Sequence, residues 1–139
     1  VKPGVVELAG VPIDLTKVTV PVYLEACRED HIAPFRSVFK ARHNFSGPVR
    51  FLLAGSGPIA GVINPPDANK YQYWRNEDEP WEVDAWLKGA TEHPGSWWPD
   101  WQAWLAQYSG DMVPARNPGD GKLTVIEDAP GSFVKVRSA

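Results

Sequence analysis

The sequence predicts an α/β fold built around a short parallel sheet. Two apolar segments, residues 18–27 and 49–54, are rich in β-branched and aliphatic residues, as expected of strands that are buried on both faces. The segment between them has helical spacing, and a strand–helix–strand unit of this kind places its strands parallel. Two parallel strands do not form a stable sheet by themselves, so we expect the 139 residues to form one partial domain, residues 1–139.

The N-terminal segment and the first strand are limited by prolines. A short apolar run predicts an edge strand or an irregular segment within residues 1–15. Pro21 interrupts the apolar run of residues 18–27. Because proline cannot donate a hydrogen bond to the ladder, the strand should begin at or after this residue and continue to Cys27.

The first helix is predicted to begin at Pro34, because proline suits the first turn of a helix. Phe35, Val38 and Phe39 would share one face, since their spacing matches the helical repeat. We expect this helix to end near Asn44, before a Ser-Gly-Pro turn leads to the second strand.

The next part of the chain is predicted to be a loop followed by a second helix. Residues 67–80 are polar with interleaved aromatic residues, which is the composition of a loop. Pro80 can open a helix whose apolar stripe is formed by Val83, Trp86, Leu87 and Ala90.

A third helix is predicted by aromatic residues at helical spacing. Ser96 is its expected N-cap, and Gly110 is its expected end. The aromatic residues that share one face are Trp97, Trp101, Trp104 and Tyr108. Such a stripe favours a buried face over a platform that binds sugars or stacks on nucleic-acid bases, and Trp98, which lies off the stripe, is the one most free for another role.

The C-terminal part is predicted to form a β-hairpin. Residues 123–126 and 133–136 have the composition of strands, and an Ala-Pro-Gly turn at residues 129–131 lies between them. The predicted elements are therefore a short parallel strand–helix–strand unit, tryptophan-rich helices and a C-terminal hairpin.

Composition narrows the classes of function. A net charge of −3 and a pI near 5.6 argue against sequence-independent binding to nucleic acid. A single cysteine cannot form an internal disulfide and fits a reducing compartment. No apolar run is long enough to cross a membrane. Because the chain begins at Val1 and not at a methionine, we expect a fragment of a longer product.

Residues 55–60 match the G-x-G-x-x-A pattern of dinucleotide-binding turns, and they follow a predicted strand. However, Pro58 removes one of the backbone N–H donors that such a turn offers to a pyrophosphate. The prolines at residues 65 and 66 come before another strand can form, so no acidic residue ends a strand at the distance that the motif requires. A sharp turn at the end of a strand is the better interpretation.

Candidate catalytic and metal-binding residues are few. Cys27 lies within an apolar strand and is most simply a core residue, without the strand–cysteine–helix turn of a nucleophile. Asp30 follows the carboxyl end of a parallel strand, where α/β proteins place their ligand chemistry, although a capping or solvated carboxylate is the simpler interpretation. The histidines, at positions 31, 43 and 93, lack paired ligand spacing, so we expect no metal site.

Three segments resemble the class I polyhydroxyalkanoate synthases, in the order that the family has them. They are residues 29–34 with the sequence EDHIAP, 51–66 with FLLAGSGPIAGVINPP, and 95–105 with GSWWPDWQAWL. The APGSFV string at residues 129–134 is similar to the family's terminal motif. The resemblance covers essentially the whole chain and corresponds to the C-terminal part of a synthase catalytic domain.

The resemblance implies the C-terminal portion of an α/β-hydrolase-type fold and the function of an acyltransferase. Such synthases polymerise (R)-3-hydroxyacyl-CoA into polyester, including polyhydroxybutyrate, and release CoA without a further cofactor. A cysteine thiolate attacks the thioester, a histidine takes the thiol proton, and an acid orients the histidine or helps to activate the monomer hydroxyl. Asp30 matches the family's acid. The family also implies a cytoplasmic location, with association to polyester granules left open.

Two departures from the family pattern bear on activity. The family's nucleophilic cysteine lies upstream of any segment matched here, so we expect this chain to contain no nucleophile. Pro58 stands at the position of the family's general base, a histidine, and proline has no titratable nitrogen. We therefore expect a synthase segment that is inactive by itself. The alternative is an interaction module whose sheet edges pair with the rest of a synthase or with a second copy.

Overall fold

The computed structural model describes residues 3–137. Contacts within the chain divide it into two units, Val1–Tyr108 and Ser109–Ala139, and each is described by itself. The expectation of one partial domain stays a prediction. Among the described residues, no helix has the length and apolar character that a membrane span needs.

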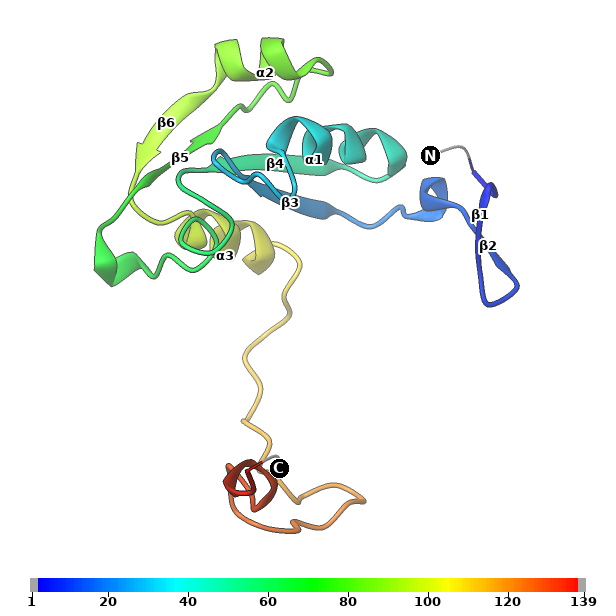
Figure 1. Cartoon of the computed structure of the whole chain (residues 1–139), viewed down its shortest axis with the longest axis vertical. Helices are drawn as coiled ribbons and strands as arrows, with labels where there is room; N and C mark the ends of the chain where they lie inside the picture. Colours follow the sequence, from blue (N-terminus) through cyan, green and yellow to red (C-terminus); the bar gives the residue numbers. More distant parts are fainter. Residues whose placement is uncertain (1–2, 138–139) are drawn as a thin grey trace. The chain divides into compact units, whose positions relative to one another are not determined.

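The first unit is built on a mixed four-stranded sheet in the order β3-β4-β5-β6 (Figure 1). β3 (Val22–Cys27) and β4 (Val49–Ala54) are parallel, and α1 (Phe35–Ala41) lies between them in the chain. β5 (Gln72–Arg75) and β6 (Thr91–Pro94) continue the sheet with antiparallel pairing. The predicted strand–helix–strand unit is confirmed, and β3 begins directly after the proline that limits it.

Side chains of the sheet alternate between two faces, and helices lie on both (Figure 1). α1 and α2 (Val83–Gly89) cover one face, where Phe39, Phe51 and Trp86 form the centre of an aromatic core. The ring centroid of Phe51 lies 4.9 Å from that of Phe39 and 4.9 Å from that of Trp86. α3 (Trp98–Ala106) covers the opposite face.

The prediction of a loop over residues 67–80 is wrong for β5, which pairs with a strand on each side. β6 is a further strand that the sequence pattern does not predict. Both strands are only four residues long and lie within polar segments, so local composition does not distinguish them from loops. Pairing with neighbouring strands makes them part of the sheet, because strand formation depends on context more than on intrinsic preference.

The predicted helices are confirmed, with shorter bounds. The second helix buries Trp86, as its apolar stripe predicts. The N-cap position of α3 is Trp97, one residue after the predicted Ser96, although the hydroxyl of Ser96 accepts a hydrogen bond from the backbone N–H of Trp98 at 3.1 Å. α3 ends at Ala106, before the predicted end at Gly110.

The prediction of a wholly buried aromatic stripe on the third helix is wrong in part. Trp97 and Trp104 are half-buried and pack against Tyr23, whereas Trp101 and Tyr108 are exposed. Tyr108 lies beyond the end of α3. Among the described residues, no further element covers the outer side of Trp101, so the stripe extends past the surface that the sheet offers.

A short N-terminal hairpin precedes the sheet. Its strands, β1 (Val6–Leu8) and β2 (Val11–Ile13), are antiparallel and largely exposed, which refines the prediction of an edge strand in this segment. Single turns of 3-10 helix lie at Leu15–Lys17, Arg42–Asn44, Pro66–Ala68 and Phe133–Lys135.

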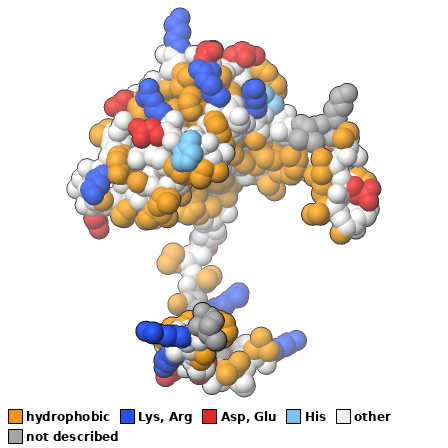
Figure 2. All heavy atoms as spheres, in the orientation of Figure 1, with side chains coloured by type: hydrophobic (Ala, Val, Ile, Leu, Met, Phe, Trp, Pro, Cys, Tyr) orange, Lys and Arg blue, Asp and Glu red, His pale blue; other side chains and the backbone are white. Residues whose placement is uncertain are grey.

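The prediction of a C-terminal hairpin in the second unit is wrong. Residues 123–126 form no strand, and the place of the expected second strand is taken by the 3-10 turn at Phe133–Lys135. A two-stranded ribbon is marginal in water unless further strands or a helix pack on it. The large apolar side chains of this unit, Leu123 and Ile126 among them, are exposed, and apolar side chains are visible over its surface (Figure 2).

Candidate functional site

The candidate site lies where the parallel strands β3 and β4 end. The last residues of the two strands are register partners. Beyond them, the backbone N–H of Glu29 donates a hydrogen bond to the carbonyl oxygen of Ser56 at 3.0 Å. The segment that carries Asp30 therefore runs beside the segment that carries Pro58, and both lie at the carboxyl end of the parallel strands.

Asp30 is half-buried, and backbone groups orient its side chain. Its Oδ1 atom accepts hydrogen bonds from the N–H groups of Ile32 at 2.7 Å and Ala33 at 2.9 Å, just before α1 begins. Its own N–H donates to the carbonyl oxygen of Cys27 at 3.2 Å. The carboxylate thus caps the turn that leads to α1, and it does so at the end of the sheet where α/β proteins place ligand chemistry.

Pro58 lies in a helical turn that follows β4. Within this turn the N–H of Gly61 donates to the carbonyl oxygen of Gly57 at 2.9 Å, and the N–H of Ile63 donates to that of Ile59 at 2.8 Å. Pro58 is half-buried and offers neither an N–H donor nor a titratable nitrogen. The sharp turn predicted for the end of this strand is confirmed.

The turn packs tightly on Cys27. A Cβ atom at Gly61 would lie 2.5 Å from Cys27 Sγ and 2.5 Å from the carbonyl oxygen of Gly55, so only glycine fits there. Cys27 is buried, and its thiol donates to Glu25 Oε1 at 3.2 Å. Burial, together with the Glu25 and Asp30 carboxylates, raises the pKa of the Cys27 thiol to about 12. The thiol is protonated at neutral pH, as suits a core residue better than a nucleophile.

The three histidines lie in separate surroundings. His31 is exposed. His43 stacks on Trp81 with ring centroids 3.6 Å apart, and His93 stacks on Tyr73 with centroids 5.0 Å apart. Within the described part of the chain, no group of three or more histidine, cysteine, aspartate or glutamate side chains is arranged to hold a metal ion.

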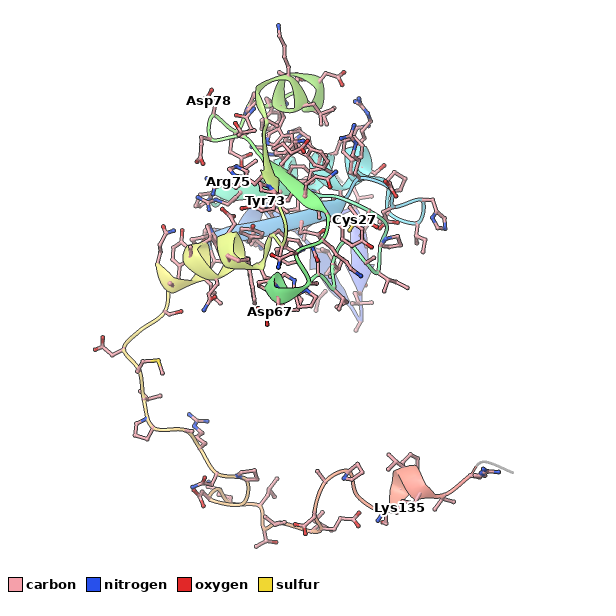
Figure 3. The ribbon with its side chains drawn as sticks, turned by 90° about the vertical axis from the view of Figure 1, so that its left-hand side faces the viewer. Cys27, Asp67, Tyr73, Arg75, Asp78 and Lys135 are labelled. Atoms are coloured by element: carbon pink, nitrogen blue, oxygen red, sulfur yellow. The ribbon has the colours of Figure 1, made fainter. Side chains whose placement is uncertain are left out.

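Asp100 on α3 is buried and links the helix to three strands of the sheet. Its carboxylate accepts a hydrogen bond from the hydroxyl of Tyr23 on β3 at 2.8 Å, and it pairs with Arg75 on β5. Arg50 on β4 places Nη1 3.6 Å from Asp100 Oδ2. Figure 3 shows Arg75 and Tyr73 extending from β5. Burial, with the hydrogen bond to Asp100, holds the pKa of Tyr23 far above its usual range.

This buried acid has only a weak signal in the sequence. An aspartate between aromatic residues on a predicted helix indicates a carboxylate near a buried face, and so requires a partner. The partners come from strands far away in the chain, at separations of 77 residues for Tyr23 and 25 residues for Arg75. No local pattern identifies them.

Two indole groups connect the start of α3 with the turn that carries Pro58. The Nε1–H of Trp97 donates to the carbonyl oxygen of Gly61, and the Nε1–H of Trp98 donates to that of Val62, both at 2.9 Å. Trp98, which lies off the predicted stripe, therefore has a specific polar contact with the candidate site.

Comparison with known proteins identifies relatives of this chain. No family model matches the chain. The chain is 51% identical over 131 residues to the poly(3-hydroxyalkanoate) polymerase subunit PhaC of Rhizobium etli, a match that covers 94% of this chain and 21% of that protein. It is 45% identical over 137 residues to the subunit of the same name from Cupriavidus necator, covering 98% of this chain and 23% of that protein.

The chain is a homologue of the C-terminal part of the poly(3-hydroxyalkanoate) polymerases. A polymerase of Methylorubrum extorquens matches as well, at 46% identity over 97% of this chain and 22% of its own length. The chain thus spans about a fifth of the length of these relatives. The resemblance to polyhydroxyalkanoate synthases that the sequence motifs predict is confirmed.

Proposed function

We propose that this chain is the part of a polyhydroxyalkanoate polymerase that supplies the acid and the general-base position of a thioester-transfer site. The whole enzyme transfers (R)-3-hydroxyacyl groups from CoA to a growing polyester and releases CoA, with no cofactor beyond the CoA thioester itself. Asp30 is the acid, and residue 58 stands at the position of the base. The hydrogen bond from Glu29 to Ser56 carries this proposal, because it joins the two segments side by side.

The way in which Asp30 is held suits the role of an orienting acid. Two backbone N–H groups fix its Oδ1 atom, so the direction of the carboxylate does not depend on the base that it serves. In a Cys–His–Asp set, the acid orients the imidazole, the imidazole takes the thiol proton, and the thiolate attacks the thioester carbonyl. The acyl group then stays on sulfur until the next monomer hydroxyl attacks it.

By itself, the chain is proposed to be inactive. Pro58 cannot accept a proton, so the base is missing from the position where the turn would present it. Cys27 does not replace the missing nucleophile, because its thiol is buried, bonded to Glu25 and held at a pKa of about 12. We also propose an α/β-hydrolase-type fold for the whole enzyme, and a cytoplasmic location at polyester granules.

Release of CoA from 3-hydroxybutyryl-CoA tests this proposal. The full chain should give no release above background. The chain mixed with the remaining N-terminal part of a homologous polymerase should also give none. Pro58→His in that mixture should restore turnover, whereas Pro58→His in the chain alone should not. Turnover by the unaltered chain alone would refute the proposed inactivity, and no turnover in the reconstituted Pro58→His mixture would refute the assigned base position.

Asp30→Asn is the matched variant in the reconstituted Pro58→His mixture. It keeps the size of the side chain and the oxygen that caps the turn, but it removes the negative charge. Loss of the orienting acid should lower turnover about a thousandfold or more. An effect below about tenfold would show that Asp30 only caps α1.

The free edge of β3 favours a second candidate function, that of an interaction module. Among the described residues, β3 pairs with β4 on one side only, and every second one of its six residues directs its backbone N–H and C=O groups to the free edge. A strand of this length with little charge at a sheet edge favours pairing with another strand. Since more than three quarters of the matched relatives lies outside this chain, the proposed partner is the rest of a polymerase.

The oligomeric state and binding of a partner test this second candidate. Light scattering should give a monomer for the chain alone and a one-to-one complex when the N-terminal part of a homologous polymerase is added. Glu25→Pro removes a backbone N–H that points to the free edge, because the N–H groups of Val22 and Arg28, at odd spacings from it, bond toward β4, and this variant should weaken the complex. A stable homodimer would identify a second copy as the partner, and a monomer that binds nothing would refute the module.

A further inference from the structure

The start of α3 holds the turn that carries residue 58 through two directed hydrogen bonds. Trp97 donates to Gly61 O and Trp98 donates to Val62 O, each at 2.9 Å. An indole has a single N–H donor, so each bond fixes a direction as well as a distance. The two acceptors are consecutive carbonyl groups, which prevents the end of the turn from rotating around either bond.

α3 is itself fixed to the sheet close to these tryptophans. Asp100, in the first turn of the helix, is bonded to Tyr23 on β3 and Arg75 on β5, and it lies near Arg50 on β4. Hydrogen bonds that involve a charged partner are shorter and stronger than neutral ones. The two indole donors therefore lie at the start of α3, which Asp100 joins to three strands.

The turn is also confined by the end of the sheet. Gly61 has no room for a Cβ atom because Cys27 Sγ and the carbonyl oxygen of Gly55 lie against it. Its N–H is bonded to Gly57 O, and the N–H of Ile63 is bonded to Ile59 O. The packing against Cys27 and Gly55 and the two indole bonds thus both limit movement of the turn.

We propose that Trp97 and Trp98 are positioning residues for the side chain at position 58. Their indole N–H groups hold the turn at the level of Asp30, so that residue 58 faces the acid in one orientation. The inference rests on the proposed function of this turn, but it concerns the geometry of the chain and can be tested without turnover.

A role in packing alone is the competing explanation. Trp97 stacks on Tyr23 with ring centroids 6.2 Å apart and contacts the buried cluster around Leu52, so its ring contributes to stability whether or not its N–H is bonded. Phenylalanine keeps an aromatic ring and removes the donor. Trp97→Phe and Trp98→Phe therefore separate the hydrogen bond from most of the packing. Trp101→Phe is the matched control, because Trp101 is on the same helix, is 41% exposed and meets the Trp97 ring edge to face, so it alters this packing without removing either indole donor.

Amide hydrogen exchange of the full chain, followed by NMR, is the first test. Exchange at the N–H groups of Gly61 and Ile63 should become about tenfold faster for each indole donor removed. Exchange in the middle of β4, at Phe51 and Leu53, should stay within about twofold of its original rate. Trp101→Phe should leave all of these rates unchanged.

Three results of this test would overturn the proposal. One is unchanged exchange in the turn of a folded Trp97→Phe or Trp98→Phe variant. Another is an equal increase in the turn and in β4, which would show that the tryptophans support the sheet as a whole. The third is an equal increase in the turn caused by Trp101→Phe. A variant that does not fold counts with the second result, because the loss is then global.

An imidazole introduced by Pro58→His provides a readout that packing alone would not change. Its ring C–H resonances should be single and sharp when both tryptophans are present. The double change Trp97→Phe and Trp98→Phe should broaden or split them, and Trp101→Phe should not. Broad resonances with both tryptophans present, or sharp ones without them, would overturn the proposal. Failure of CoA release in the reconstituted mixture would leave these spectra unaltered, so the two proposals fail separately.

Discussion

The two faces of the sheet are closed by different kinds of contact. Toward α1 and α2, the sheet buries Phe39, Phe51 and Trp86 in an apolar cluster in which the rings meet edge to face. Toward α3, the packing of Trp97 and Trp104 on the sheet is accompanied by a buried carboxylate, Asp100, with a tyrosine and two arginines around it. The turn that carries Pro58 is bonded to the helix of this second face.

The difference indicates that the aromatic face contributes mainly to stability, whereas the α3 face also fixes the positions of particular groups. Apolar burial is roughly proportional to area and has no preferred direction, so the aromatic face can hold the sheet together without fixing any single group. Hydrogen bonds and ion pairs contribute less net free energy, but they fix angles and distances. We therefore expect changes on the aromatic face to lower stability most, and changes on the α3 face to alter both stability and the geometry of the site.

The largest effect is expected on the aromatic face. Phe51→Ala removes a fully buried ring that contacts Phe39 and Trp86, and the cavity should lower the free energy of unfolding by about 4 kcal/mol. Urea denaturation measures this change. Ile32→Ala is the control, because Ile32 is 76% exposed and should cost under about 0.5 kcal/mol. Similar losses for the two variants would contradict the assignment of the core to this face.

Replacement of the buried Asp100 should give the second largest loss of stability. Asp100→Ala leaves Arg75 and Arg50 without their buried partner, which should cost about 3 kcal/mol in the free energy of unfolding. Tyr23→Phe removes a single hydrogen bond and should cost about 1 kcal/mol. In Asp100→Ala, amide exchange at Gly61 should also rise more than exchange in β4. A loss confined to stability, with no preferential change in the turn, would refute the link between Asp100 and the site.

Alkaline pH should weaken the α3 face, because two of its groups release protons more readily in the unfolded chain. The pKa of Cys27 is raised from 9.0 to about 12, so its contribution to stability is full below pH 9 and is lost as the pH rises toward 12. Tyr23, whose ordinary pKa is 10.0, is shifted in the same direction. Stability measured by urea denaturation should therefore fall above about pH 9.

Cys27→Ala is the matched variant for this pH dependence. It should flatten the first part of the fall, just above pH 9, where the unfolded thiol begins to ionise. Tyr23→Phe should flatten the part that begins near pH 10. If the unaltered chain and Cys27→Ala lose stability in parallel just above pH 9, then the folded thiol is not protected from ionisation.

The parts of the fold that the sequence predicts are those set by local pattern. β3, β4 and α1 have continuous apolar runs or helical spacing, with prolines that mark their limits. β5 is different, because Gln72–Arg75 is only four residues long within a polar segment and becomes a strand through its neighbours. The opposite error occurs at residues 123–126, where strand composition is present but the structure has no strand.

Local sequence patterns predict the candidate site only in part as well. The position of Asp30 follows from the end of a predicted strand, and the turn at Pro58 follows from its glycines and proline. The contacts of Trp97 and Trp98 join residues 36 positions apart in the chain, and they depend on where α3 lies over the sheet. A sequence pattern shows that these tryptophans are on a helix, but it does not show which carbonyls they reach.

The smallest effect is expected at an exposed ion pair on the aromatic side. Arg36 on α1 and Asp84 on α2 lie 2.7 Å apart, with side chains that are 52% and 80% exposed. Exposed pairs gain little, because water and salt screen the charges and two long side chains lose freedom. Arg36→Ala should lower the free energy of unfolding by under about 0.5 kcal/mol in urea denaturation, and a cycle with Asp84→Ala should give a coupling of similar size. A coupling above about 1 kcal/mol would mean that charge also holds α1 to α2, and that the two faces differ less than their buried residues indicate.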